Sequence, residues 1–207
     1  MTPSVPSEPS ESPVPSRPPE PSESPVPSRP SEVSGPVVSL RRAGEADRPA
    51  VERLWLMFRH DMSEFEEVLP HPDGTFREER LHLAFGAPDW IPYLVRAGDR
   101  PVAFAFVRGL RGPTHVLNSF FVVRGARRTG VGLRAVREIV ARHPGSWDIA
   151  FQDANTTAVR FWRRVATEIA GDAWTEERRE VPGRPDLPPD AWISFRTASA
   201  PGRPPMV

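Results

Sequence analysis

The chain has 207 residues, of which 38% are hydrophobic, enough for one hydrophobic core, so we expect a single folded domain. Basic and acidic residues number 27 each, so the net charge gives no sign of the basic surface that nucleic acids or anionic lipids usually require. All the basic residues are arginines and no cysteine occurs, which excludes a Schiff-base or phosphate-loop lysine, a thiol nucleophile and a cysteine-rich zinc site.

The first 36 residues differ in composition from the rest of the chain. The segment EPSESPVPSR stands at residues 8–17 and again, unchanged, at residues 20–29. Such a Pro/Ser/Glu segment buries too little apolar surface to offset its chain entropy, so residues 1–36 are predicted to form a disordered tail ahead of a domain at residues 37–200. The tail is interpreted either as a solubilising or passenger extension or as a ligand for a proline-recognising partner.

Targeting segments are not evident in this sequence. No apolar run approaches the roughly 20 residues of a membrane span. The N-terminus also lacks the basic and apolar regions of a signal peptide. We therefore expect a cytoplasmic protein without a membrane or nucleic-acid partner.

The first half of the domain is predicted to contain one strand, two helices and then three further strands. A strand at residues 37–42 precedes a helix that begins near Asp47 and carries an apolar stripe at spacings of three and four, made of Val51, Leu54, Trp55, Phe58, Met62 and Phe65. A weaker helical pattern covers residues 75–85. Two strands joined by a turn at Gly98 and Asp99 then form an antiparallel hairpin, and a third strand covers residues 114–123.

In the second half, helices and strands alternate. We expect a helix from Gly130 to His143, a strand at residues 147–153, a helix capped by Asn155, and strands near residues 173–181 and 192–197. The strand at 114–123 and the strand at 147–153 are joined through a helix, so they should be parallel. The expected fold class is therefore α/β in the broad sense. It has a mixed sheet of the α+β kind, which is mostly antiparallel and contains one parallel β-α-β crossover.

The sequence FFVVRGARRTGVG, at residues 120–132, forms a glycine- and arginine-rich corner between the third strand and the next helix. Unpaired backbone N–H groups and the helix dipole favour an anion at such a corner. Glycines 130 and 132 let a phosphate approach the backbone, and Arg124, Arg127 and Arg128 add forked donors.

Two phosphate-binding motifs compete for this corner. A Walker loop requires a lysine that the chain lacks. Residues 130–135 fit the dinucleotide fingerprint G-x-G-x-x-A, with Asp153 about twenty residues further on. However, residues 124–129 separate the strand from Gly130, where that fold has a tight turn. A dinucleotide-binding protein therefore stays as an alternative.

Residues 127–132, RRTGVG, resemble the R/Q-x-x-G-x-G/A signature of the GNAT acyltransferase superfamily. NTTAVRFW, at residues 155–162, resembles the second signature of that superfamily. The resemblance extends from residue 37 to about residue 197 and includes the order of the elements. HDMSEF at residues 60–65 and GSWDI at residues 145–149 are further similar to a subgroup of small bacterial predicted acetyltransferases.

The resemblance implies a GNAT-like acyl-CoA-binding fold and an N-acetyltransferase that transfers an acetyl group from acetyl-CoA to a primary amine by direct attack, without a metal. Backbone N–H groups of residues 128–133 would bind the pyrophosphate, and the main chain of Phe121 and Val122 would pair with the pantetheine arm. A homodimer is compatible with this family. The implied cofactor-binding residues are Phe121, Val122, Arg127, Arg128, Thr129, Gly130, Val131, Gly132, Leu133, Asn155 and Trp162.

The sequence departs from the family at the usual acid and base positions. Many members place a glutamate where Ser119 stands and a tyrosine where Trp162 stands, and an indole is no acid at neutral pH. The catalytic residues are thus unassigned, with Asp153, Glu64 and Ser119 as candidates. The acidic run near the end of the first helix, which consists of Asp61, Glu64, Glu66 and Glu67, is typical of a solvated face. A domain that binds acyl-CoA without efficient turnover is the alternative function.

Overall fold

The structure is a computed structural model that describes residues 37–181, 183 and 188–198. The tail predicted at residues 1–36 lies outside the described residues, as do the last residues of the predicted domain.

Within the described residues, the elements follow the predicted order. They are β1 (Val38–Arg42), α1 (Arg48–Glu66), α2 (Glu79–Gly86), β2 (Trp90–Ala97), β3 (Arg100–Arg108), β4 (Thr114–Val122), α3 (Val131–Arg142), β5 (Ser146–Phe151), α4 (Thr156–Ala170), β6 (Trp174–Arg179) and β7 (Asp190–Arg196), with short 3₁₀ turns at Glu45–Asp47 and Arg124–Ala126. None of the described helices is both long and apolar enough to cross a membrane.

Helix α2 begins later than the predicted residue 75. The carboxylate of Asp73 accepts hydrogen bonds from the backbone N–H of Thr75 at 3.0 Å and from its hydroxyl at 2.7 Å. This local turn competes with helix formation. The carbonyl of Arg77 accepts a bond from the indole N–H of Trp55 at 3.1 Å, which ties the segment before α2 to α1.

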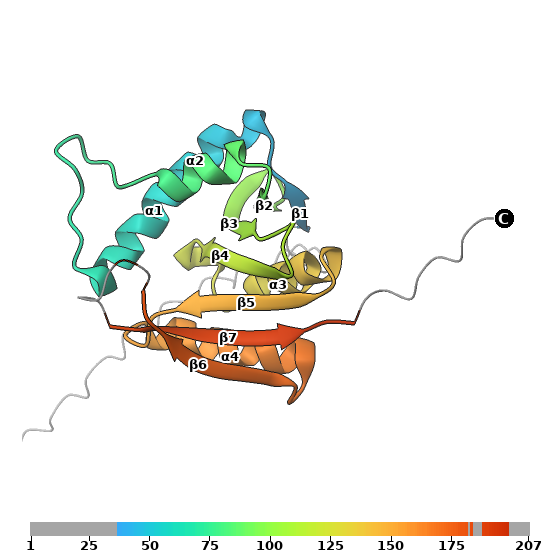
Figure 1. Ribbon diagram of the computed structural model, residues 1–207. Helices are drawn as coiled ribbons and strands as arrows, with labels where there is room; N and C mark the ends of the chain where they lie inside the picture. The colour runs from blue at the N-terminus through green and yellow to red at the C-terminus, as the bar shows by residue number, and fades with distance from the viewer. Residues whose placement is uncertain (1–36, 182, 184–187, 199–207) are drawn as a thin grey trace, which may run out of the picture. The chain divides into compact units, whose positions relative to one another are not determined.

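The seven strands of the described residues form one mixed sheet in the order β1-β2-β3-β4-β5-β7-β6 (Figure 1). Strands β4 and β5 are parallel, as predicted from the helix that joins them, and the other neighbours are antiparallel. The fold class expected from the sequence is therefore confirmed.

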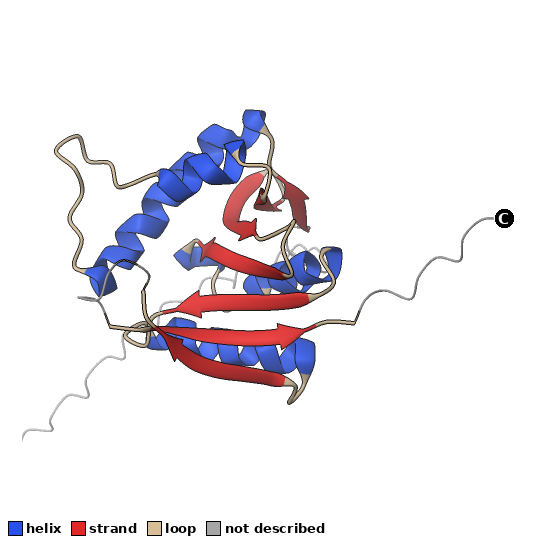
Figure 2. Ribbon diagram, in the orientation of Figure 1, coloured by secondary structure: helices blue, strands red, loops and turns tan. Residues whose placement is uncertain are grey.

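Helices cover both faces of this sheet, and each face has its own core (Figure 2). The part of the α1 stripe from Val51 to Phe58 and a buried leucine of α2 pack on one face against Leu94, Phe104, Phe106 and Phe121. Met62 and Phe65 of the predicted stripe are only partly buried and lie outside this core. Helices α3 and α4 pack on the other face, where Trp147 and Ile149 of β5 are fully buried. Because side chains alternate along a strand, residues 148, 150 and 152 lie on the face opposite α4.

Candidate active site

Strands β4 and β5 pair only over a short stretch and then separate. The paired residues run from Thr114 and Ser146 to Leu117 and Ile149, whereas β4 continues to Val122 and β5 to Phe151. Just after Leu117, the pairing between β3 and β4 skips one residue of β4. Asn118 has no partner on β3 and forms a β-bulge. Such a bulge bends the strand, and here it coincides with an opening between two parallel strands.

Main-chain groups of β4 face this opening. The N–H of Val123 donates to the carbonyl of Val102 on the β3 side at 2.9 Å. Alternate residues of a strand direct their N–H and C=O groups to opposite sides, so the groups of Val122 and Phe120 point toward β5. The main-chain groups of Phe121 point toward β3, so the pairing with pantetheine implied for Phe121 is wrong and Phe120 takes its place. The carbonyl of Val122 accepts a bond from Nε of Arg127 at 2.9 Å, so its N–H and the Phe120 groups face the opening.

The loop that follows β4 presents a row of backbone donors. In the part of the chain that the structure describes, the N–H groups of residues 128–133 have no hydrogen-bond acceptor, and the first helical bond of α3 runs from Arg134 to Gly130 at 3.0 Å. Gly130 precedes the helix with φ +86°, and Arg128 is also left-handed with φ +64°. These donors sit at the positive end of the helix dipole, where an anion is stabilised.

Arg124 and Arg127, which the sequence offered as phosphate donors, both form ion pairs with Asp61 of α1. The Nη2 atom of Arg124 lies 2.9 Å from Oδ1 of Asp61, and the guanidinium of Arg127 contacts Oδ2. Burial by itself would raise the pKa of Asp61, but the hydrogen bonds from Arg127 and Arg124 outweigh it and hold the pKa below its ordinary value. Asp61 is therefore ionised and holds the loop to α1 through two arginines. The prediction that Asp61 belongs to a solvated face is wrong for this residue.

Asp61→Asn is expected to lower the free energy of unfolding at pH 7 by about 1–2 kcal/mol, because two arginines lose their shared counter-charge. Since the folded-state pKa is depressed, this stabilisation exists above the unfolded-state pKa and disappears as the pH falls through the folded-state pKa. Urea unfolding should therefore show that the wild type has a higher free energy of unfolding than Asp61→Asn at pH 7, and that this difference vanishes near pH 2. Glu64→Gln, an exposed acid on the same helix, is the control, and equal losses for both variants would contradict the assignment.

The three catalytic candidates from the sequence lie apart. Asp153, after β5, is paired with Arg178 at 2.7 and 2.8 Å, and Glu64 is exposed on α1. Ser119 is buried on β4, and its hydroxyl donates to the side-chain oxygen of Asn118 at 3.4 Å. In the described residues no hydrogen bond or ion pair joins any two of them. No group of three or more histidine or acidic side chains in that part of the chain could hold a metal ion.

The second signature lies at the start of α4. The side-chain oxygen of Asn155 accepts the N–H of Ala158 at 3.0 Å, which confirms the predicted cap. Trp162 is buried and packs edge-on against Phe120 of β4, with ring centroids 5.5 Å apart. Phe161 stacks on the same Phe120 ring at 5.8 Å. Helix α4 therefore supports the strand that borders the opening.

Asp190, the first residue of β7, did not stand out in the sequence, where the strand was expected to begin at residue 192. Its neighbour Ala191 pairs with Phe151, so Asp190 lies beside Gln152 at the end of β5. The side-chain oxygen of Gln152 is buried and has no partner among the described residues. Partial burial raises the pKa of Asp190, and the charge of Arg80 opposes this rise.

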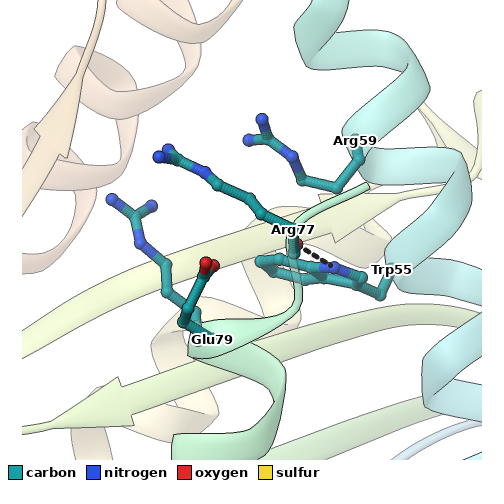
Figure 3. Close-up of a pocket in the computed structure, with 5 residues that line it drawn as sticks. Trp55, Arg59, Arg77 and Glu79 are labelled. Carbon is teal, nitrogen blue, oxygen red and sulfur yellow. Dashed lines mark hydrogen bonds between the residues drawn. The ribbon is translucent and has the colours of Figure 1, made fainter. Parts of the chain in front are cut away.

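A pocket of about 260 Å³ lies between α1 and the start of α2, lined by Trp55, Arg59, Arg77, Glu79 and Arg80 (Figure 3). Arg59 is only 2% exposed; its Nη2 atom lies 2.7 Å from Glu66, and its Nε atom has no hydrogen-bond partner among the described residues. Arg59 did not stand out in the sequence, although it follows Trp55 by four positions and so lies on the apolar stripe of α1.

Comparison with solved structures shows the same fold in several acetyltransferases. The diaminobutyrate acetyltransferase of Paenibacillus lautus, solved with its substrate and coenzyme A, has a TM-score of 0.56 and 14% identity over 81% of this chain and 100% of that one. The ribosomal-protein-S18-alanine N-acetyltransferase of Escherichia coli has a TM-score of 0.55 and 13% sequence identity, over 80% of this chain and 97% of that one. An acetyltransferase of Thermus thermophilus has a TM-score of 0.57 and 15% sequence identity, over 77% of this chain and 97% of that one.

At the level of sequence, no curated protein matches the chain. Residues 54–166, from the middle of α1 to α4, do match the acetyltransferase (GNAT) family. This segment contains the β4–β5 opening, the donor loop and the Asn155 cap, and it confirms the resemblance inferred from the two signatures. The chain therefore belongs to the acetyltransferase (GNAT) family.

Proposed function

We propose that the protein is an N-acetyltransferase that transfers the acetyl group of acetyl-CoA to a primary amine by direct attack. The observation that carries this proposal is the opening between β4 and β5, which leads to the loop at residues 128–133 whose N–H groups have no acceptor among the described residues. The pantetheine arm would pair with Phe120 and Val122 as a short added strand. The pyrophosphate would bind the loop and the N-terminus of α3.

The chemical step needs a base and a place for the developing negative charge. An N–H near the bulge at Asn118 is suited to stabilise the oxyanion, because backbone donors there are fixed before the reaction. We assign the base to Asp190, acting directly or through water, because it is half-buried beside Gln152 and its pKa is raised by burial. The thiolate of CoA takes its proton from water or from the ammonium of the tetrahedral intermediate, because the buried indole of Trp162 cannot supply one.

A domain that binds acyl-CoA without turnover is the second candidate. The observation in its favour is that the residues at both usual acid and base positions, Ser119 and Trp162, are buried and have side chains unsuited to proton transfer at neutral pH. It differs from the first proposal only in the rate of the chemical step.

Calorimetric titration with acetyl-CoA, together with an assay of free CoA release over a panel of amines, separates these functions. Binding with amine-dependent CoA release supports the acetyltransferase, and binding without release supports the second candidate. Preferential binding of NAD would overturn both and restore the dinucleotide alternative. The described sheet argues against that alternative, because it has one parallel pair and not a parallel sheet.

A further inference from the structure

We infer that the acceptor is a small amine that also carries a carboxylate or a phosphate, and that this anionic group binds in the pocket formed by Arg59, Arg77 and Arg80. The inference rests on the proposed acetyltransferase function and names the class of its second substrate.

The pocket holds more positive charge than the described residues neutralise. Arg59 is paired with Glu66, but Arg77 and Arg80 form no ion pair with any described residue. Figure 3 shows the side chains of Arg59 and Arg77 extending in the same direction past the ring of Trp55. Guanidinium groups gathered in this way match the planar, multiple acceptors of a carboxylate or phosphate.

Arg59 lacks a hydrogen-bond acceptor among the described residues for part of its guanidinium, and Arg80 lies within the electrostatic influence of the other two arginines. Arg59 is almost fully buried, and its Nε–H lacks an acceptor among the described residues, which an incoming anion would provide. The side chain of Arg80 is exposed to solvent. Partial desolvation by the protein around it, and then the positive charges of Arg77 and Arg59, lower the pKa of Arg80. A bound anion would relieve the repulsion among the three cations.

A chain of contacts links the pocket to the strand that borders the opening where the thioester would lie. Trp55, which lines the pocket, stacks on Phe106 of β3 with ring centroids 5.7 Å apart. Phe106 pairs in register with Ser119 of β4, the residue next to the bulge. On the other side, Arg80 lies near enough to Asp190 for the two charges to influence each other. An anion held by the arginines would thus position a nearby amine between the pocket and β4.

The size and mixed charge of the site favour a small zwitterionic ligand. A pocket of about 260 Å³ accommodates one anionic group and a short carbon chain beside the indole. Glu79 also lines the pocket, and Asp190 lies close to Arg80. These carboxylates attract the ammonium end of the ligand, while the arginines bind its anionic end.

The test compares matched amines in the full-length protein. Alanine is set against alaninamide, and O-phosphoethanolamine against ethanolamine, with kcat/KM measured for each. We expect the anionic member of at least one pair to be favoured about tenfold or more, and the pair that shows it identifies the group as carboxylate or phosphate. The double variant Arg77→Gln, Arg80→Gln should reduce this preference about tenfold or more, mainly through KM, without changing the Kd of acetyl-CoA.

Arg53→Gln, an exposed arginine on α1 outside the pocket, is the matched control and should leave the preference unchanged. Arg59 is spared because its substitution would disturb the core. Equal use of anionic and neutral amines, or a preference that survives the double variant, overturns the inference while the acetyltransferase function stands. If no amine is acetylated, the proposed function fails. Calorimetry with alanine and O-phosphoethanolamine then tests the pocket alone, and the lack of binding in wild type would overturn it.

Discussion

Gly130→Asp is expected to weaken acetyl-CoA binding about a hundredfold or more, whereas Gly130→Asn should weaken it less than about tenfold. Gly130 has φ +86°, and no atom lies within 4 Å of the place where a Cβ would stand. Both side chains therefore fit and bear the same left-handed strain of about 1 kcal/mol. Only aspartate adds a negative charge beside the free N–H groups of residues 128–133, where the pyrophosphate is proposed to bind.

Calorimetric Kd values for acetyl-CoA, with melting temperatures measured alongside, decide this prediction. Comparable Kd values for the two variants would show that the loop does not bind an anion. Gly132 is a poorer probe than the sequence suggested, because a Cβ there would lie 3.3 Å from the ring of Phe161. Any substitution at Gly132 would therefore combine a packing defect with the charge effect.

Asp190→Asn is expected to lower kcat about 10²- to 10⁴-fold while leaving the Kd of acetyl-CoA unchanged, because a positioned base is lost without any change in size. Asp153→Asn is the matched control, since Asp153 is an exposed carboxylate already paired with Arg178. We expect its kcat to stay within about twofold of wild type. A larger loss at Asp153 than at Asp190 would reverse the assignment.

The pH profile gives an independent readout of the same residue. A base acts in its deprotonated form, so kcat should rise with pH through the raised pKa of Asp190, and this limb should be absent in Asp190→Asn. A second rise from deprotonation of the acceptor amine should remain in both proteins. No falling alkaline limb from a catalytic tyrosine is expected, because tryptophan stands at position 162.

Local sequence patterns determined the order of the elements, the parallel crossover and the position of the donor loop. The apolar stripe from Val51 to Phe58 specifies α1, and the polar cap at Asn155 marks the start of α4. These features depend on residues close together in the chain, and their periodicity and capping rules are local. The predicted start of α2 was wrong by a few residues, because the hydrogen bonds of the Asp73 side chain favour a turn there.

The tertiary structure alone decided which charged side chains meet. Asp61 and Arg127 lie far apart in the sequence, yet packing of α1 against β4 brings them into contact. The same packing buries Arg59 in the pocket, and the pairing of β5 with β7 sets Asp190 beside Gln152. A charged residue reads as solvent-exposed in a linear pattern, because its partners and its burial depend on elements that only the folded chain brings together.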